Sequence, residues 1–270
     1  MVQIFSKELF AGKVALVTGG TSGIGEGTAK AYAACAASVM ITGRNEENGA
    51  RIVGEIEAEG GIAAFMAGDV TDSAFADALV AATVERFGKL DILFNNAGKF
   101  TTQPFDEITD ELWHEILDIN LNAQFYMARA TVRQMKKQGK GGAIVNMSSE
   151  SGLTCYPHTT LYGVSKRAVN HLTQGMAADL AGDHIRVNAV NPGDVDTPMH
   201  VAVYSGTGLE EDVWRQMAAS IVPLGRVSTV DDVANAVLYL SSDGADNITG
   251  VLFSIDGGTV ITSGWVGGEE

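Results

Sequence analysis

Cysteine is nearly absent from this chain of 270 residues, which contains only Cys35 and Cys155. Two cysteines are too few for a disulfide framework or a cysteine-rich metal cluster, and such usage is typical of a reducing compartment. We therefore predict a cytoplasmic protein. The five histidines lack the i, i+4 spacing of a zinc-binding helix, so the sequence predicts no metal site.

Positive charge and long apolar runs are also scarce. The chain has 18 Lys and Arg against 33 Asp and Glu, a formal charge of −15, which disfavours nucleic acid and anionic membranes as partners. The longest apolar stretch, around Ala31–Ile41, is well short of the ~20 residues that a membrane span needs. The leader Met1–Lys13 carries Lys7 and Glu8 and has no continuous apolar core, so we expect no secretory signal.

Linkers, repeats and low-complexity tracts are missing as well. With only five prolines and 46% hydrophobic residues, the composition is that of a folded globular protein. A chain of this length can form one large α/β domain, so we predict a single domain over residues 1–270.

Short β-branched runs alternate with helical stretches along the chain. The expected strands are Val14–Thr18, Ser38–Thr42, Ala63–Met66, Leu90–Phe94, Ala143–Met147, Ile185–Val190 and Val251–Ile255. The expected helices are Gly23–Ala36, Glu46–Glu59, Ser73–Phe87, Asp110–Lys137, Tyr162–Leu180 and Val230–Leu240. Seven strands with crossover helices predict a doubly wound parallel sheet with helices on both faces. The only long segment without strands, about 194–226, is a candidate substrate lid.

A glycine-rich turn follows the first expected strand. It reads Thr18-Gly19-Gly20-Thr21-Ser22-Gly23-Ile24-Gly25, a G-x-x-x-G-x-G spacing without the ending of a P-loop. Glycines permit positive φ and let a pyrophosphate approach the N-terminus of the next helix. The turn by itself is a weak signal, since it can also be a plain strand-to-helix connection.

Three polar residues form the candidate catalytic group. Tyr162 and Lys166 lie four positions apart, on one face of an expected helix, and Ser149 lies just past the end of an expected strand. All three should therefore reach the ligand crevice of the sheet. Reduction of a ketone requires a hydrogen-bond donor and a proton donor at the carbonyl oxygen. We expect Ser149 to polarise the carbonyl, Tyr162 to exchange the proton, and the Lys166 ammonium to favour the phenolate of Tyr162.

Further motifs accompany this group in a characteristic order. They are Asn95-Asn96-Ala97-Gly98, Asn120, Tyr162-Gly163-Val164-Ser165-Lys166, Asn191-Pro192-Gly193 and Asp256-Gly257-Gly258. With the turn and the thirteen-residue step from Ser149 to Tyr162, the chain resembles the short-chain dehydrogenase/reductase family from Lys13 to Gly258. The resemblance implies a Rossmann fold, a nicotinamide cofactor and hydride transfer between an alcohol and a ketone, as in a carbonyl reductase or an alcohol or polyol dehydrogenase.

The resemblance also implies individual roles. Asn120 would hold a kinked helix and a water that links Lys166 to solvent, and Lys166 would also hold the nicotinamide ribose. Asp69 and Val70 would border the adenine, and Asn96 the adenosine ribose. The expected cofactor-binding residues are Gly19, Thr21, Ser22, Gly23, Ile24, Gly25, Arg44, Asp69, Val70, Asn96, Ala97, Gly98, Tyr162, Lys166, Pro192, Gly193, Val195 and Thr197.

The residues after the second expected strand bear on the choice between NADP(H) and NAD(H). The second strand is followed by Gly43-Arg44-Asn45, with no carboxylate to bind a ribose 2′-hydroxyl, and Arg44 can instead fork onto a 2′-phosphate. We expect preference for NADP(H), with NAD(H) also possible. Ser22, Glu46 and Glu47 argue the other way, and Arg44 stacking on adenine would leave either cofactor acceptable.

Two other functions remain open. A 3-oxoacyl-carrier-protein reductase would need a basic docking face for its acidic partner; Arg133 fits this need, but Asp179 and Asp183 oppose it. A cofactor-binding sensor without catalysis is the second alternative, and the presence of all four expected catalytic residues argues against it. The apolar faces of the long helices predict a homotetramer, with a dimer as runner-up.

Overall fold

The computed structural model describes residues 5–199, 201 and 210–262, so residues 1–4 of the expected leader and residues 200 and 202–209 of the expected lid lie outside it. Its sheet has seven strands in the order β3-β2-β1-β4-β5-β6-β7. The strands are β1 (Val14–Thr18), β2 (Ser38–Gly43), β3 (Ile62–Ala67), β4 (Ile92–Asn95), β5 (Gly142–Met147), β6 (Ile185–Pro192) and β7 (Leu252–Ile255). All six neighbouring pairs are parallel, which confirms the predicted doubly wound sheet.

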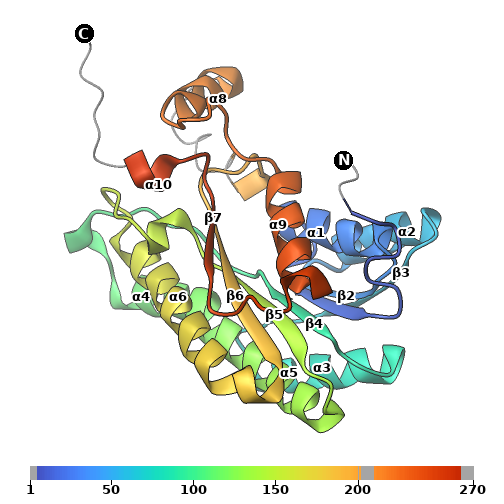
Figure 1. The fold of residues 1–270 in the computed structure, drawn as a ribbon. Coiled ribbons are helices and arrows are strands. Elements are labelled where there is room, and N and C mark those ends of the chain that lie inside the picture. The colour runs from blue at the N-terminus through green and yellow to red at the C-terminus, as the bar shows by residue number, and fades with distance from the viewer. Residues whose placement is uncertain (1–4, 200, 202–209, 263–270) are drawn as a thin grey trace.

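Helices cover both faces of this sheet (Figure 1). They are α1 (Gly23–Ala34), α2 (Glu46–Ala58), α3 (Ser73–Phe87), α4 (Asp110–Leu117), α5 (Ala123–Gln138), α6 (Thr160–Leu180), α8 (Glu211–Ser220), α9 (Val230–Ser241) and α10 (Thr259–Thr262). Helices α1, α2 and α9 pack on one face, and α3, α5 and α6 pack on the other (Figure 1). Among the described residues, no helix is long and apolar enough to cross a membrane.

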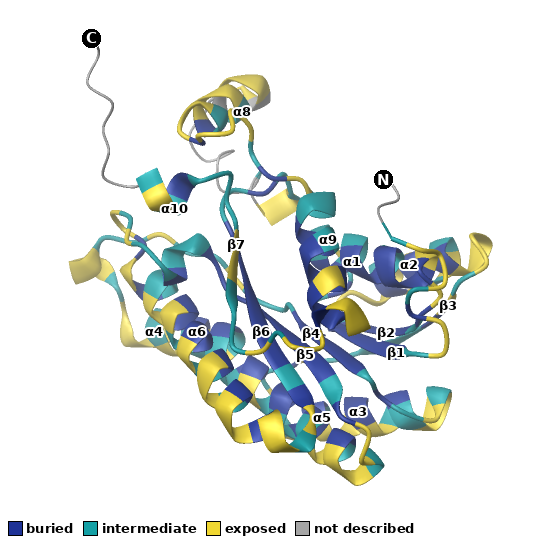
Figure 2. Ribbon diagram, in the orientation of Figure 1, coloured by how far each residue is buried: buried dark blue, intermediate teal, exposed yellow. Residues whose placement is uncertain are grey.

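The central strand β1 shows why the sheet is buried between two layers of helices. Ala15 and Val17 belong to the core beneath α1 and α9, whereas Leu16 belongs to the core beneath α3 and α5. Successive side chains of a strand point to opposite faces, so a strand covered on both sides needs apolar residues at every position. The strands in the middle of the sheet are accordingly buried along most of their length (Figure 2).

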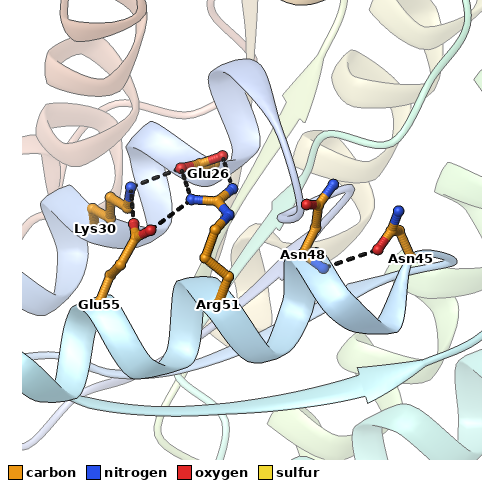
Figure 3. Close-up of polar contacts among 6 residues, drawn as sticks. All are labelled: Glu26, Lys30, Asn45, Asn48, Arg51 and Glu55. Atoms are coloured by element: carbon orange, nitrogen blue, oxygen red, sulfur yellow. Dashed lines mark hydrogen bonds and ion pairs between the residues drawn. The ribbon is translucent and has the colours of Figure 1, made fainter.

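Local polar groups define several helix ends. The side chain of Asn45 accepts a hydrogen bond from the Asn48 N–H at 2.9 Å at the start of α2 (Figure 3). At the start of α9, Thr229 and Asp232 form a reciprocal capping box. Helix α3 ends at Gly88, whose φ of 84° suits a residue without a β-carbon.

Two segments differ from the sequence prediction. The expected helix Asp110–Lys137 is interrupted by a π-helical turn, Asp118–Asn122, which separates α4 from α5. The strandless segment after β6 contains helix α8, which the strand-and-helix alternation did not predict. That segment returns to the body of the protein through a parallel bridge between Val195 and Ser228.

A four-residue charge network joins α1 to α2 (Figure 3). Arg51 of α2 donates to both carboxylate oxygens of Glu26, at 3.1 and 3.0 Å, and to Glu55 at 2.8 Å. Lys30 of α1 lies 2.7 Å from both Glu26 and Glu55. The network therefore fixes the first turn of α1, where Glu26 lies, against the helix that follows β2.

Candidate active site and cofactor-binding cleft

A cleft of about 1060 Å³ lies beyond the carboxyl ends of the central strands. Its lining includes residues that follow β1, β4, β5 and β6, and the strand order reverses direction between β1 and β4. Such a switch point is where doubly wound sheets bind ligands. The lining holds every residue expected to bind the cofactor or to catalyse except Gly25 and Asn120, namely Gly19, Thr21, Ser22, Gly23, Ile24, Arg44, Asp69, Val70, Asn96, Ala97, Gly98, Ser149, Tyr162, Lys166, Pro192, Gly193, Val195 and Thr197.

The glycine-rich turn has the shape of an anion cradle. Gly19 has a φ of 62°, and a β-carbon on Gly25 would lie 2.2 Å from the Gly19 carbonyl oxygen, so helix α1 starts in direct contact with the turn. Ser22, at the start of α1, makes no capping hydrogen bond with its side chain. The N–H groups of the first helical turn are therefore available to a phosphate, which fits a dinucleotide pyrophosphate.

Asn96 stabilises this turn from the neighbouring strand. Its side-chain amide donates to the carbonyl oxygens of Thr18 at 2.9 Å and Gly19 at 3.2 Å, and its N–H donates to the Thr18 hydroxyl at 2.9 Å. The sequence analysis expected Asn96 only at the adenosine ribose. The structure shows that both hydrogen-bonding directions of its amide nitrogen are used to hold the shape of the turn.

Two residues of opposite charge line the other end of the cleft. Arg44 is exposed and follows β2, and Asp69 follows β3. Hydrogen bonds from the backbone N–H and hydroxyl of Thr71, at 2.9 and 2.8 Å, lower the pKa of Asp69, and the charge of Arg44 lowers it further. This end can therefore offer a guanidinium to a phosphate and a carboxylate to a hydroxyl or amine.

Ser149, Tyr162 and Lys166 come together at the floor of the cleft. Ser149 follows β5, and its side chain lies close enough to Tyr162 to lower the pKa of that hydroxyl; Tyr162 lies on α6 with Lys166 one turn further along. The Lys166 ammonium is 2% exposed, donates to the Met147 carbonyl oxygen at 3.0 Å and lies 5.6 Å from the centre of the Tyr162 ring. The arrangement can present two hydroxyl donors to one carbonyl oxygen.

Burial dominates the proton affinities of this group. It raises the pKa of Tyr162 to about 12, although the nearby Ser149 hydroxyl acts to lower it, and it lowers the pKa of Lys166 to about 8. Desolvation of the phenolate outweighs the stabilising contact, so Tyr162 is a phenol and Lys166 is mostly an ammonium at neutral pH. The expected stabilisation of a Tyr162 phenolate by the Lys166 ammonium stays a prediction.

The π-helical turn places Asn120 behind Lys166. Asn120 is fully buried; its side-chain nitrogen donates to the Lys99 carbonyl oxygen at 2.9 Å and to the Ser165 hydroxyl at 3.0 Å, while its oxygen accepts from the Lys99 N–H at 2.8 Å. A β-carbon on Gly98 would lie 3.0 Å from the Asn120 oxygen and 3.4 Å from the Lys166 nitrogen. Asn120 thus borders the same small space as the lysine without lining the cleft.

The structure adds residues that the sequence analysis did not assign. The ring of Phe100 packs edge-on against Tyr162, with 4.8 Å between ring centres. The Ser148 hydroxyl donates to the Lys166 carbonyl oxygen at 3.0 Å and so ties α6 to the end of β5. Nothing in the sequence distinguishes Phe100, because it lies in a loop whose course depends on the surrounding fold.

Comparisons with known proteins agree with this geometry. Residues 19–260 match a family model described as enoyl-(acyl carrier protein) reductase. The 3beta-hydroxysteroid dehydrogenase of Mediterraneibacter gnavus is 37% identical over 264 residues, which cover 92% of this chain and 95% of that protein. The galactitol 2-dehydrogenase of Agrobacterium fabrum is 38% identical over 252 residues, which cover 91% and 96%.

A solved structure is similar over the same extent. The crystal structure of an actinorhodin polyketide ketoreductase variant with NADPH superposes with a TM-score of 0.88, at 34% identity, over 92% of this chain and 97% of that chain. The fold, the cleft and these relatives lead to one conclusion: the chain belongs to the short-chain dehydrogenase/reductase family and is an NAD(P)-dependent oxidoreductase of alcohol and ketone groups.

Proposed function

We propose that the chain is a carbonyl reductase or an alcohol or polyol dehydrogenase whose reaction is carried out by Ser149, Tyr162 and Lys166, with Asn120 in support. The observation that carries this proposal is the buried contact of the Ser149 hydroxyl with Tyr162 beside the Lys166 ammonium. The names of the hydroxysteroid and galactitol relatives support an alcohol or a polyol as the reduced form of the substrate pair.

In the proposed reduction, a bound reduced nicotinamide supplies a hydride to the carbonyl carbon. Ser149 donates a hydrogen bond to the carbonyl oxygen and orients it. As the carbonyl π bond breaks, its oxygen takes the proton from the Tyr162 hydroxyl, which is a phenol at neutral pH because burial raises its pKa to about 12. Lys166 stabilises the phenolate that forms, and its ammonium is oriented by its hydrogen bond to the Met147 carbonyl oxygen. Asn120 supports this arrangement by joining the loop at Lys99 to Ser165, the neighbour of Lys166 on α6.

Replacement of the proton donor tests the proposal. Tyr162→Phe removes one hydroxyl, so we expect kcat to fall by at least ~10²-fold, the contribution of a positioned proton donor, while cofactor affinity stays close to that of the wild type. Turnover is measured with a ketone panel by absorbance near 340 nm. Cofactor affinity is measured by fluorescence titration of the reduced cofactor. Near-native turnover by the variant would show that Tyr162 is not the proton donor.

For the cofactor, we propose a preference for NADP(H). Arg44 lines the cleft after β2, where a guanidinium can pair with a 2′-phosphate, and the ketoreductase with NADPH is a structural neighbour. Asp69 lines the same cleft, and the charge of Arg44 lowers its pKa.

The alternative of a 3-oxoacyl-carrier-protein reductase has less support from the surface charges. Arg133 lies 3.7 Å from Asp77, and Lys136 lies 2.6 Å from Asp183. These basic groups of α5 are already paired with carboxylates, so they offer little to an acidic carrier protein. Reduction of a panel ketone without any carrier protein would distinguish the two functions, and an inert protein that binds the cofactor would favour the sensor.

We also propose one domain with the segment 194–226 as its substrate lid, a cytoplasmic location and a homotetrameric assembly. The low cysteine content supports the location. Phe125 of α5 and Val164 of α6, each 42% exposed, support an assembly through these helices.

A further inference from the structure

Glu150 is a carboxylic acid in the cleft that the proposed reaction does not use. It follows Ser149 directly, opens the short helix Glu150–Gly152, and lines the cleft. Its Oε2 is buried, and so is the hydroxyl of Tyr156; neither atom has a hydrogen-bond partner of good geometry among the described residues. A carboxyl group left in this condition beside the reacting centre calls for a functional explanation.

Two other carboxylates act on Glu150. A β-carbon on Gly193 would lie 2.8 Å from Glu150 Oε2 and 3.2 Å from the β-carbon of Asp256, so Glu150 packs against the backbone after β6. The charged groups that act on Glu150 are Asp194, in the loop after β6, and Asp256, after β7. Among the described residues, its other titratable neighbours are Tyr156, from its own loop, and Tyr162, from α6.

The rest of the substrate end adds negative charge. Glu115 and Asp118 line the same cleft, and the nearby Lys99 is paired with Glu115 at 2.5 Å. Lys166 is directed at the Met147 carbonyl oxygen. Neither ammonium is therefore placed to neutralise Glu150.

Resting on the proposed function, we propose that Glu150 determines substrate specificity: its carboxylate makes the cleft accept uncharged, hydroxyl-bearing ketones and alcohols and disfavour substrates with an anionic group beside the reacting carbon. A carboxylate accepts hydrogen bonds from hydroxyl groups but repels a second carboxylate, most strongly where water is excluded. Because Glu150 directly follows Ser149, its carboxylate can hydrogen-bond or repel a substrate group that lies one or two bonds from the reacting carbonyl.

The ionisation of Glu150 predicts a pH dependence of this discrimination, which the Glu150→Gln variant separates from the loss of the Lys166 ammonium near pH 8. Burial and the charges of Asp194 and Asp256 raise its pKa to about 7, although the nearby Tyr156 hydroxyl acts to lower it. The carboxylate therefore forms as the pH rises through neutrality. Discrimination against anionic substrates should be weak at pH 5.5 and strong at pH 8.5.

The test uses two ketones of nearly equal size. The probes are 4-hydroxy-2-butanone, which is uncharged, and 3-oxobutanoate, which is an anion throughout this pH range. Wild-type kcat/KM should favour the hydroxyketone, and Glu150→Gln should narrow the ratio about tenfold at pH 8.5 and little at pH 5.5. Glu57→Gln, the same change on an exposed position of α2, should leave the ratio as in the wild type.

Either of two results overturns the inference: a wild-type ratio that is constant from pH 5.5 to 8.5, or an equal ratio in wild type and Glu150→Gln at pH 8.5. The first applies even if the variant does not fold, which circular dichroism would reveal. If a probe is not turned over, its inhibition constant against the best panel ketone replaces kcat/KM. Tyr162→Phe tests the proposed function separately, because it should reduce turnover of both probes without changing their ratio.

Discussion

The contact between helix α1 and the glycine-rich turn permits a quantitative prediction for Gly25→Ala. The new β-carbon would lie 2.2 Å from the Gly19 carbonyl oxygen and 2.6 Å from the Asn96 side-chain nitrogen. To restore ordinary contacts, the turn and the helix must separate by about 1 Å, an overpacking that costs ~1–3 kcal/mol. The same movement weakens the hydrogen bonds of Asn96 to Thr18 and Gly19, at ~1 kcal/mol each.

We therefore expect Gly25→Ala to lose about 3–5 kcal/mol of unfolding free energy and to bind the cofactor at least ~10-fold more weakly. Gly54→Ala is the matched control, since a β-carbon on this exposed glycine of α2 meets nothing within 4 Å. That change should instead stabilise the protein by ~0.5–1 kcal/mol. Urea denaturation and fluorescence titration measure the two quantities. A Gly25→Ala protein with wild-type stability and affinity would refute the close contact.

Three further predictions concern pH, cofactor and assembly. Ketone reduction should fall as the pH rises through about 8, because burial lowers the pKa of Lys166 to about 8 and the ammonium is lost above that value; a constant kcat from pH 6 to 9.5 would contradict this. Arg44→Asp should lower kcat/KM for NADPH at least ~10-fold and leave that for NADH nearly unchanged, whereas equal losses would argue for adenine stacking alone. Light scattering should give four times the chain mass of 28.3 kDa, and a monomer at working concentrations would exclude the tetramer.

The seven strands could be predicted because short apolar runs alternate with longer helical stretches along the chain. In β1, Ala15, Leu16 and Val17 form a run too short for a helix and without a polar position, as in a strand buried on both faces. The spacing of Ser149, Tyr162 and Lys166 likewise suffices to bring them to one cleft, since strand ends and helix faces have fixed geometry.

Other features depend on contacts between distant parts of the chain and could not be predicted from local patterns. The π-helical turn at Asn120 is accompanied by hydrogen bonds to Lys99, twenty-one positions earlier. The pKa of Tyr162 depends on how deeply the folded protein buries it, which the spacing of residues does not reveal. Helix α8 has only ten residues and lies in a segment that does not follow the alternation of strands and helices seen in the rest of the chain.

The charge network of Glu26, Lys30, Arg51 and Glu55 has a consequence for redesign of the cofactor site. The network connects α1, which follows the glycine-rich turn, to α2, which follows Arg44 (Figure 3). The glycine-rich turn and the Arg44 loop are therefore held in a fixed position relative to each other. Arg44 can therefore be exchanged by itself without loss of these ion pairs, whereas Asn45 caps α2 and a β-carbon on Gly43 would lie 2.6 Å from the Thr21 hydroxyl. Replacement of Arg51 would break the ion pairs with Glu26 and Glu55, so a change of cofactor selectivity would come with a distorted phosphate site.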